Sequence, residues 1–157
     1  RPDTPGLWRP SLIEITHDPL DPEAITAKVR DAANGAVVTF LGTTRGRTAK
    51  RNVLHLEYEA YTPMAEKKLV EVAEEMRSKF SVEDVFIAHR LGRLEIEEIS
   101  LVVAVASPHR KDAFAACQYA VDRIKETVPI WKKEFFEGGE VWVESPEDHA
   151  LKSATDS

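Results

Sequence analysis

The side chains with the clearest chemical potential are basic and fall into three clusters along the chain. The clusters are Arg45, Arg47, Lys50 and Arg51, then His109, Arg110 and Lys111, then Lys125, Lys132 and Lys133. The whole chain nevertheless has a formal net charge of -6 and a pI near 5.4. Because nucleic-acid binding normally leaves a broadly basic surface, this balance argues against it. The clusters instead predict a local pocket for a small anion.

The first cluster lies in a glycine-containing loop, GTTRGR over residues 42–47, directly after an apolar strand pattern. Such a loop brings backbone N–H groups and an arginine fork, here Arg45, toward a ligand. The loop is not a nucleotide-binding loop, because neither GxxxxGK[ST] nor GxGxxG followed by a helix occurs. A solvated loop with incidental arginines explains this composition equally well, so a binding function depends on the other clusters.

The second cluster, His109 and Arg110, follows Ser107-Pro108 at the start of a predicted helix. The free N–H groups and the dipole of a helix N-terminus attract anions and disfavour neighbouring cations. Two basic or titratable side chains at this position are therefore expected to face a bound anion, and phosphate is the natural ligand.

The third cluster supplies lysines that can exchange protons. Lys125 lies in the last turn of the same predicted helix, where a cation also complements the helix dipole, and its sequence neighbours Ile124, Val128 and Pro129 are apolar. A lysine that is desolvated, or that lies beside another cation such as Lys132, loses its proton more easily. Taken alone, Lys125 is better explained as a cation that complements the helix dipole, so a role in chemistry depends on the other clusters.

The elements that position these residues alternate between helical and strand patterns. Asp21 is a predicted N-cap for a helix that starts at Pro22 and ends at Asn34-Gly35, and longer helices are predicted to start at Thr62-Pro63 and to cover 109–127. Strands are predicted at 36–41, which is expected to be buried, and at 53–61, 85–88, 100–106, 130–136 and 141–143. Alternation in the strand at 53–61 predicts Leu54, Leu56 and Tyr58 on one buried face, and in the strand at 130–136 it places Lys132 and Lys133 on opposite faces.

This order predicts a single α+β domain: a mixed, mostly antiparallel sheet packed with two long helices and one shorter N-terminal helix. Residues 1–20 are predicted to be an N-terminal tail, 21–144 the domain, and 145–157 a C-terminal tail.

Metal and hydrolase chemistry have little support. The five histidines show no HxxxH spacing, and neither CxxC nor GxSxG occurs. We interpret His55 and His89, which lie in strand patterns, as structural. The single cysteine, Cys117, lies in a helical apolar stripe and is also interpreted as structural. No apolar run reaches the roughly 20 residues that span a bilayer, and no secretory signal is evident, so a cytoplasmic protein without membrane contact is expected.

Five segments, taken in order, resemble the large subunit of molybdopterin synthase: GAVVTFLGTTR, LEYEAYTPMAEKKL, HRLG, ASPHR and KETVPIWKKE. The resemblance covers about residues 35–144. It implies a sulfurtransferase that needs no cofactor or metal in this step and forms the central homodimer of a heterotetramer. Each protomer would receive the C-terminal Gly-Gly thiocarboxylate of a small ubiquitin-like subunit. The substrate would be cyclic pyranopterin monophosphate, which gains two sulfurs to form the molybdopterin dithiolene.

The resemblance also implies the site residues. Arg45, His109 and Arg110 would bind the phosphate and pterin, while Lys125 and Lys132 would guide the thiocarboxylate, contact the substrate and shuttle protons.

Two alternatives remain open from the residues alone. A non-catalytic α+β module could use the same basic clusters to bind an anion or an acidic partner, and it would tolerate arginine in place of either lysine. A phosphate-ester enzyme of another type would turn over without a protein sulfur donor.

Overall fold

The computed structural model describes residues 11–48 and 51–143, and it confirms the α+β fold class. A four-stranded sheet forms its centre, with the strand order β1-β5-β7-β2. Its strands are β1 (Leu12–Thr16), β2 (Ala36–Thr43), β5 (Asp84–Arg90) and β7 (Ile99–Ser107). The β1–β5 pair is parallel and the other two pairs are antiparallel.

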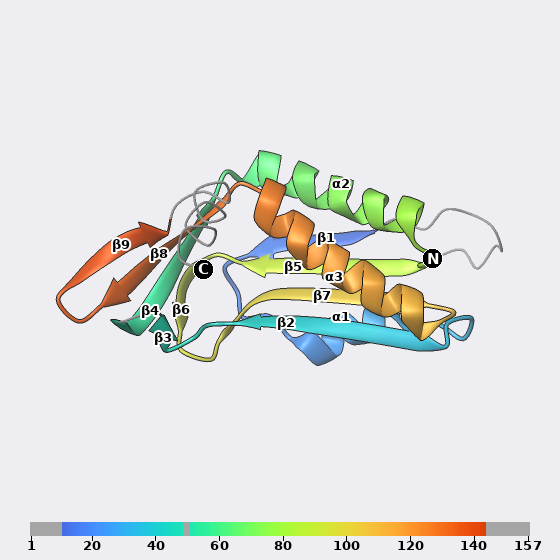
Figure 1. The fold of residues 1–157 in the computed structure, drawn as a ribbon, viewed down its shortest axis with the longest axis horizontal. Coiled ribbons are helices and arrows are strands. Elements are labelled where there is room, and N and C mark those ends of the chain that lie inside the picture. Colours follow the sequence, from blue (N-terminus) through green and yellow to red (C-terminus); the bar gives the residue numbers. More distant parts are fainter. Residues whose placement is uncertain (1–10, 49–50, 144–157) are drawn as a thin grey trace, which may run out of the picture.

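Three helices cover this sheet in two layers, and Figure 1 shows α2 and α3 together on one face. The helices are α1 (Pro22–Val29), α2 (Thr62–Lys79) and α3 (Arg110–Thr127). The α2–α3 layer buries one core that includes Leu69, Met76 and Cys117 against the sheet. Helix α1 buries Ile25 and Val29 against the opposite face. The sheet is therefore apolar on both faces, and no helix in the described part of the chain is long and apolar enough to cross a membrane.

A second, five-stranded sheet lies at one end of the first (Figure 1). It contains β3 (Arg47–Thr48), β4 (Arg51–Ala60), β6 (Gly92–Glu95), β8 (Ile130–Phe136) and β9 (Gly139–Val143). Strand β4 is at its centre and pairs with β3, β6 and β8, while β9 completes a hairpin with β8. The sequence pattern had predicted one sheet. Strand length and alternation identify strands, but not which distant strands pair.

Local sequence explains where the helices begin. The Asp21 carboxylate accepts hydrogen bonds from the N–H groups of Glu23 and Ala24 at 3.1 and 3.2 Å, so it caps α1 as predicted. That helix ends at Val29, five residues before the predicted stop at Asn34. At the start of α3, the Ser107 hydroxyl accepts from the His109 N–H at 3.2 Å.

Three further expectations from the sequence were wrong. The predicted N-terminal tail contains β1, because Ile13 and Ile15 alternate inward and pack on the core. The strand at 36–41 is not buried, since β2 is at the edge of its sheet and leaves Val37 and Leu41 37% and 41% exposed. Leu54 points outward because a register shift between Val53 and His55 reverses the alternation of β4. The predicted C-terminal tail, 145–157, lies outside the described residues.

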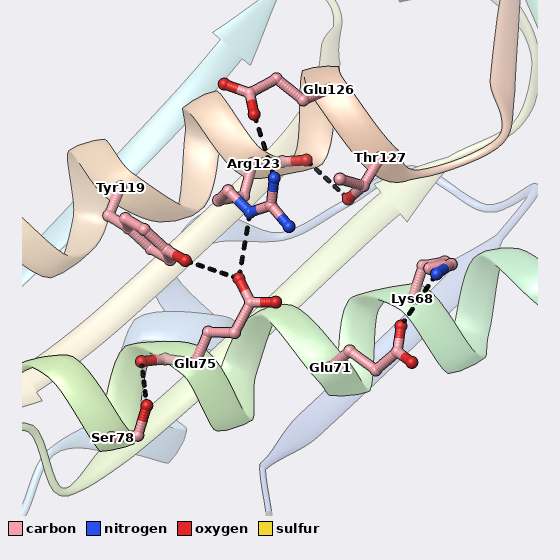
Figure 2. A network of polar contacts seen from close by, with 8 residues as sticks. All are labelled: Lys68, Glu71, Glu75, Ser78, Tyr119, Arg123, Glu126 and Thr127. Carbon is pink, nitrogen blue, oxygen red and sulfur yellow. Dashed lines mark hydrogen bonds and ion pairs between the residues drawn. The ribbon is translucent and has the colours of Figure 1, made fainter.

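A polar network ties α2 to the second half of α3 (Figure 2). The Glu75 carboxylate accepts from the Tyr119 hydroxyl at 2.6 Å and from the Arg123 guanidinium at 3.1 Å. Arg123 also pairs with Glu126 at 3.0 Å, and the Thr127 hydroxyl donates to the Arg123 carbonyl at 2.7 Å. The last turns of α3, which contain Lys125, are thus fixed to α2.

Candidate active site

A pocket of about 370 Å³ lies where the end of the four-stranded sheet meets the second sheet and the C-terminal end of α3. Its walls come from β2, β4, β5, β7, α3, β8 and β9. The lining residues are Phe40, Gly42, Thr43, Arg45, Tyr58, His89, Ser100, Leu101, Ile124, Lys125, Val128, Ile130, Lys132 and Val143.

Three predicted site residues meet in this pocket, and each comes from a different part of the chain. Arg45 follows β2, Lys125 is in the last turn of α3, and Lys132 is on β8. Three cationic side chains around one cavity create a local positive field in an acidic protein. The pocket can therefore bind an anionic group such as a phosphate or a carboxylate.

The burial of the two lysines is the reverse of what the sequence suggested. Lys125 is exposed, so its ammonium is not stripped of water, because its apolar neighbours Ile124 and Val128 point into the core while it points out. Lys132 is partly buried, and desolvation lowers the pKa of its ammonium group. Glu134 opposes this shift, whereas the positive charges of Arg45 and Lys125 add to it. Lys132 is thus the pocket lysine that gives up its proton more easily than an ordinary lysine.

The two lysines at 132 and 133 point to opposite faces of β8, as the strand pattern predicted. Lys132 lines the pocket. Lys133 is on the other face, where its ammonium lies 3.2 Å from the Glu140 carboxylate and 5.0 Å from the centre of the Trp142 ring. Only one of this pair is therefore available to the pocket.

The remaining polar lining is uncharged and was not predicted as part of a site. Tyr58, His89 and Ser100 share this part of the pocket, and the rings of Tyr58 and His89 meet edge to face at 5.0 Å. Burial raises the pKa of the Tyr58 phenol and lowers the pKa of His89 to about 4. Both side chains are therefore neutral near pH 7.

His109 and Arg110 are not in this pocket. Both are exposed at the N-terminal end of α3, whereas Lys125 is in its last turn. At about 1.5 Å per residue, the 15 residues from Arg110 to Lys125 span roughly 22 Å. Within one chain, the two predicted halves of the site are thus at opposite ends of a helix.

The interpretation of Cys117 as structural is confirmed. Its side chain is buried in the core, and burial raises the pKa of the thiol to about 11.

His55 stacks on Phe135 with ring centres 4.3 Å apart. No group of three or more histidine, cysteine or acidic side chains suited to holding a metal ion occurs within residues 11–48 and 51–143.

The sequence did contain a signal for the uncharged part of the pocket. Tyr58 was assigned to the inward face of its strand, and His89 was assigned to an apolar strand. A polar side chain that alternation directs inward needs a hydrogen-bonding partner or a cavity. Their convergence could not be predicted, because β4 and β5 belong to different sheets.

Comparisons with known proteins identify the family. A family model described as "MoaE protein" matches residues 15–127. The "Molybdopterin synthase catalytic subunit" of Halalkalibacterium halodurans is 46% identical over 129 residues, which are 82% of this chain and 83% of that protein. Its Bacillus subtilis counterpart is 47% identical over 130 residues, 83% of each chain.

Solved structures agree as well. A molybdopterin synthase structure from Staphylococcus aureus superposes with a TM-score of 0.80 at 45% identity and covers 83% of this chain and 96% of that one. A complex of subunits 1 and 2 of molybdopterin-converting factor from Helicobacter pylori has a TM-score of 0.66 at 20% identity. The match covers 84% of this chain and 90% of that one, so the two share the fold. The family match and these identities lead to one conclusion: the chain belongs to the MoaE protein family.

Proposed function

We propose that this chain is the sulfur-transferring subunit of a molybdopterin synthase. It would take sulfur from the C-terminal thiocarboxylate of a small ubiquitin-like subunit and deliver it to cyclic pyranopterin monophosphate. The observation that carries the proposal is the convergence of Arg45, Lys125 and Lys132 on one pocket. The names of the relatives support the activity, and the two-subunit complex solved for a protein of the same fold supports a small partner.

The pocket suits a reaction between two anions. A thiocarboxylate and a phosphate repel each other, and three cations around one cavity offset that repulsion. The guanidinium of Arg45 presents paired N–H donors that match phosphate oxygens, so Arg45 would hold the phosphate. Lys125, exposed at the rim, would guide the incoming thiocarboxylate.

Lys132 would then handle the protons. Its partly buried ammonium, with a lowered pKa, can protonate the oxygen that leaves the pterin side chain as sulfur attacks, and can recover a proton from water. The attack forms a thioester that joins the pterin carbon to the tail of the small subunit through sulfur, as the carbon–oxygen bond breaks. Water then hydrolyses this thioester, which leaves the sulfur on the pterin and a carboxylate on the spent tail.

His109 and Arg110 would join the site through a homodimer. Strand β2 is an edge strand with two half-exposed apolar side chains, Val37 and Leu41, and such edges tend to pair with another strand. Ala36 is paired with Ser107, so the start of β2 lies near His109, while its end leads to Arg45. Two β2 strands related by a two-fold axis would run antiparallel. The start of β2 in one protomer would then lie beside the end of β2 in the other. The two ends of a single β2 strand are roughly 24 Å apart at 3.4 Å per residue, which is similar to the length of α3, so His109 and Arg110 of one protomer would approach the pocket of the other.

Reconstitution tests the proposed function. The chain is mixed with a thiocarboxylated small subunit and cyclic pyranopterin monophosphate, and dithiolene formation is assayed. The matched controls contain the small subunit with an ordinary carboxylate, or inorganic sulfide in its place. Dithiolene formation with the thiocarboxylate alone is expected. Equal turnover with sulfide, or none with the thiocarboxylate, would contradict the proposal.

A further inference from the structure

The uncharged part of the pocket has a hydrogen-bond acceptor that the proposed phosphate and proton chemistry does not use. His89 is only 6% exposed and lines the pocket together with Tyr58 and Ser100. A polar ring so deep in the core needs partners for both of its nitrogens. Among residues 11–48 and 51–143 the ring has one hydrogen-bonding partner.

That partner fixes the tautomer of the ring. Nδ1 of His89 lies 2.8 Å from the carbonyl oxygen of Arg90. A carbonyl oxygen can only accept, so Nδ1 carries the hydrogen and Nε2 carries a lone pair. Burial lowers the pKa of His89 to about 4, so the ring stays neutral near pH 7 and keeps that lone pair.

Nothing among the described residues donates to Nε2. The Tyr58 hydroxyl is hydrogen-bonded to the Ser100 side chain, and the Ser100 hydroxyl donates to the Gly42 carbonyl oxygen at 3.2 Å. In the described part of the chain, the side-chain nitrogen and oxygen atoms that are both fully buried and without a partner belong to Asn34 and Arg90. Nε2 of His89 also lacks a partner but is not in this set, so it is not fully buried. It is therefore open to the cavity that the side chain lines.

We propose that His89 is a specificity-determining residue whose Nε2 accepts a hydrogen bond from an N–H group of the bound heterocycle. The cations of the pocket recognise negative charge, which phosphates and carboxylates share. A neutral acceptor at the pocket wall recognises a donor that a simple phosphate ester lacks. The reduced pterin has ring N–H groups and an exocyclic amino group, so His89 would separate it from other anions. This inference rests on the proposed function.

A second source of an N–H group is the backbone of the partner's tail. The surroundings favour the heterocycle, because the Tyr58 and Phe40 rings line the same pocket and offer flat apolar contact. Binding to the tail is therefore treated as an alternative outcome, measured separately.

Two variants and one wild-type measurement test the proposal. His89→Phe keeps a ring against Tyr58 and removes the lone pair, whereas His89→Gln can direct an amide oxygen toward the same place. We expect His89→Phe to raise the Kd and KM for the cyclic pterin roughly threefold to tenfold, because one neutral hydrogen bond contributes about that much. The kcat should be nearly unchanged. His89→Gln should recover part of that loss, and the Kd for the small subunit should not change in either variant.

An unchanged pterin Kd in folded His89→Phe protein, or a loss confined to the small subunit, would overturn the proposal. Thermal melts establish folding. If neither variant folds, the 15N resonance of His89 Nε2 in the wild type decides: it should shift on addition of the pterin and not on addition of inorganic phosphate, and no shift would refute the contact. Wild-type dithiolene formation is measured alongside. Its absence would contradict the proposed function, whereas normal activity with an unaffected His89→Phe variant would contradict this inference alone.

Discussion

Tyr58 and Lys132 are directly opposite each other in the antiparallel pairing of β4 with β8, and both side chains line the pocket. Opposed residues in such a pair have Cβ atoms about 4.5–5.5 Å apart, so the two side chains leave the sheet as neighbours on the pocket wall. Burial raises the pKa of Tyr58, so the phenol supplies no negative charge to Lys132. Desolvation, with the positive charges of Arg45 and Lys125, therefore keeps the pKa of Lys132 low, and Tyr58 does not oppose it with a negative charge.

Replacing Lys132 by arginine tests whether this proton matters. Lys132→Arg keeps the positive charge but stays protonated at every working pH. If Lys132 transfers a proton, the variant should lose on the order of a hundredfold to ten-thousandfold in single-turnover dithiolene formation. The matched control is Lys125→Arg: because Lys125 is exposed and its charge is kept, it should retain more turnover. The opposite ranking of the two variants would assign proton transfer to Lys125.

The lowered pKa of Lys132 also predicts how stability depends on pH. Its pKa in the folded chain is below the ordinary value of 10.5, so between the two values the unfolded chain binds more protons than the folded one. The free energy of unfolding therefore rises with pH in that window, and below it the full cost of burying the charge is present. Denaturant melts at several alkaline pH values should show this slope in the wild type and a weaker one in Lys132→Met. Identical slopes would refute the shift.

Much of the fold could be predicted because its signals are local. The cap at Asp21, the prolines at helix starts and the strand alternation each depend on a few neighbouring residues. The exposed position of β2 could not be predicted, since an apolar strand has the same composition at the edge of a sheet as at its centre. The short strand β1 was hidden in a proline-rich segment, and its burial depends on β5, about 70 residues later.

The site divides in the same way. The basic clusters that contain Arg45, Lys125 and Lys132 predicted a shared anion pocket, and the family resemblance then selected these three side chains. Which lysine is desolvated depends on the packing of β8 against β4, so the apolar neighbours of Lys125 gave the wrong answer. His89 was interpreted as structural, and its place beside a cavity could not be predicted because it depends on the contact between two sheets.

Cys117 should have no part in the sulfur transfer. Its thiol is buried in the α3 core, and its pKa is raised to about 11, so little reactive thiolate forms near neutral pH. Cys117→Ala should keep near-normal dithiolene formation while losing about 1 kcal/mol of stability through the lost packing. The native thiol should react with a disulfide reagent only after denaturant is added. Rapid labelling of the folded protein, or a large loss of turnover in Cys117→Ala, would contradict this expectation.

The network between α2 and α3 predicts an acid-sensitive contribution to stability. Hydrogen bonds from Arg123 and Tyr119 lower the pKa of the Glu75 carboxyl below its ordinary value of 4.5. Its contribution is therefore present above pH 4.5 and is lost as the pH falls through the lowered value. Because the network is close to solvent, the effect should be small and weaker in high salt. Melts of Glu75→Gln should differ from wild type at neutral pH and converge with it in acid; a constant difference would argue against the titration.

The proposed homodimer predicts that two inactive variants can restore each other. Within one chain, Arg110 and Lys125 are roughly 22 Å apart along α3, too far for one small pterin to contact both. If β2 pairs with β2 of a second copy, Arg110 of one protomer completes the pocket that holds Lys125 of the other. Arg110→Ala and Lys125→Ala should each be nearly inactive as homodimers. A mixed dimer of the two has one pocket with both changes and one with neither.

Mixing the two variants should therefore recover up to half the wild-type activity per heterodimer, measured as dithiolene formed after subunit exchange. Differently tagged chains and tandem purification isolate the heterodimer, which removes uncertainty about how far exchange has gone. The matched control pairs Lys125→Ala with Lys132→Ala. Both residues line the same pocket of one chain, so in that heterodimer each pocket carries one defect and no activity should return. Recovery in the control as well, or no recovery in the purified Arg110→Ala and Lys125→Ala heterodimer, would refute a shared site.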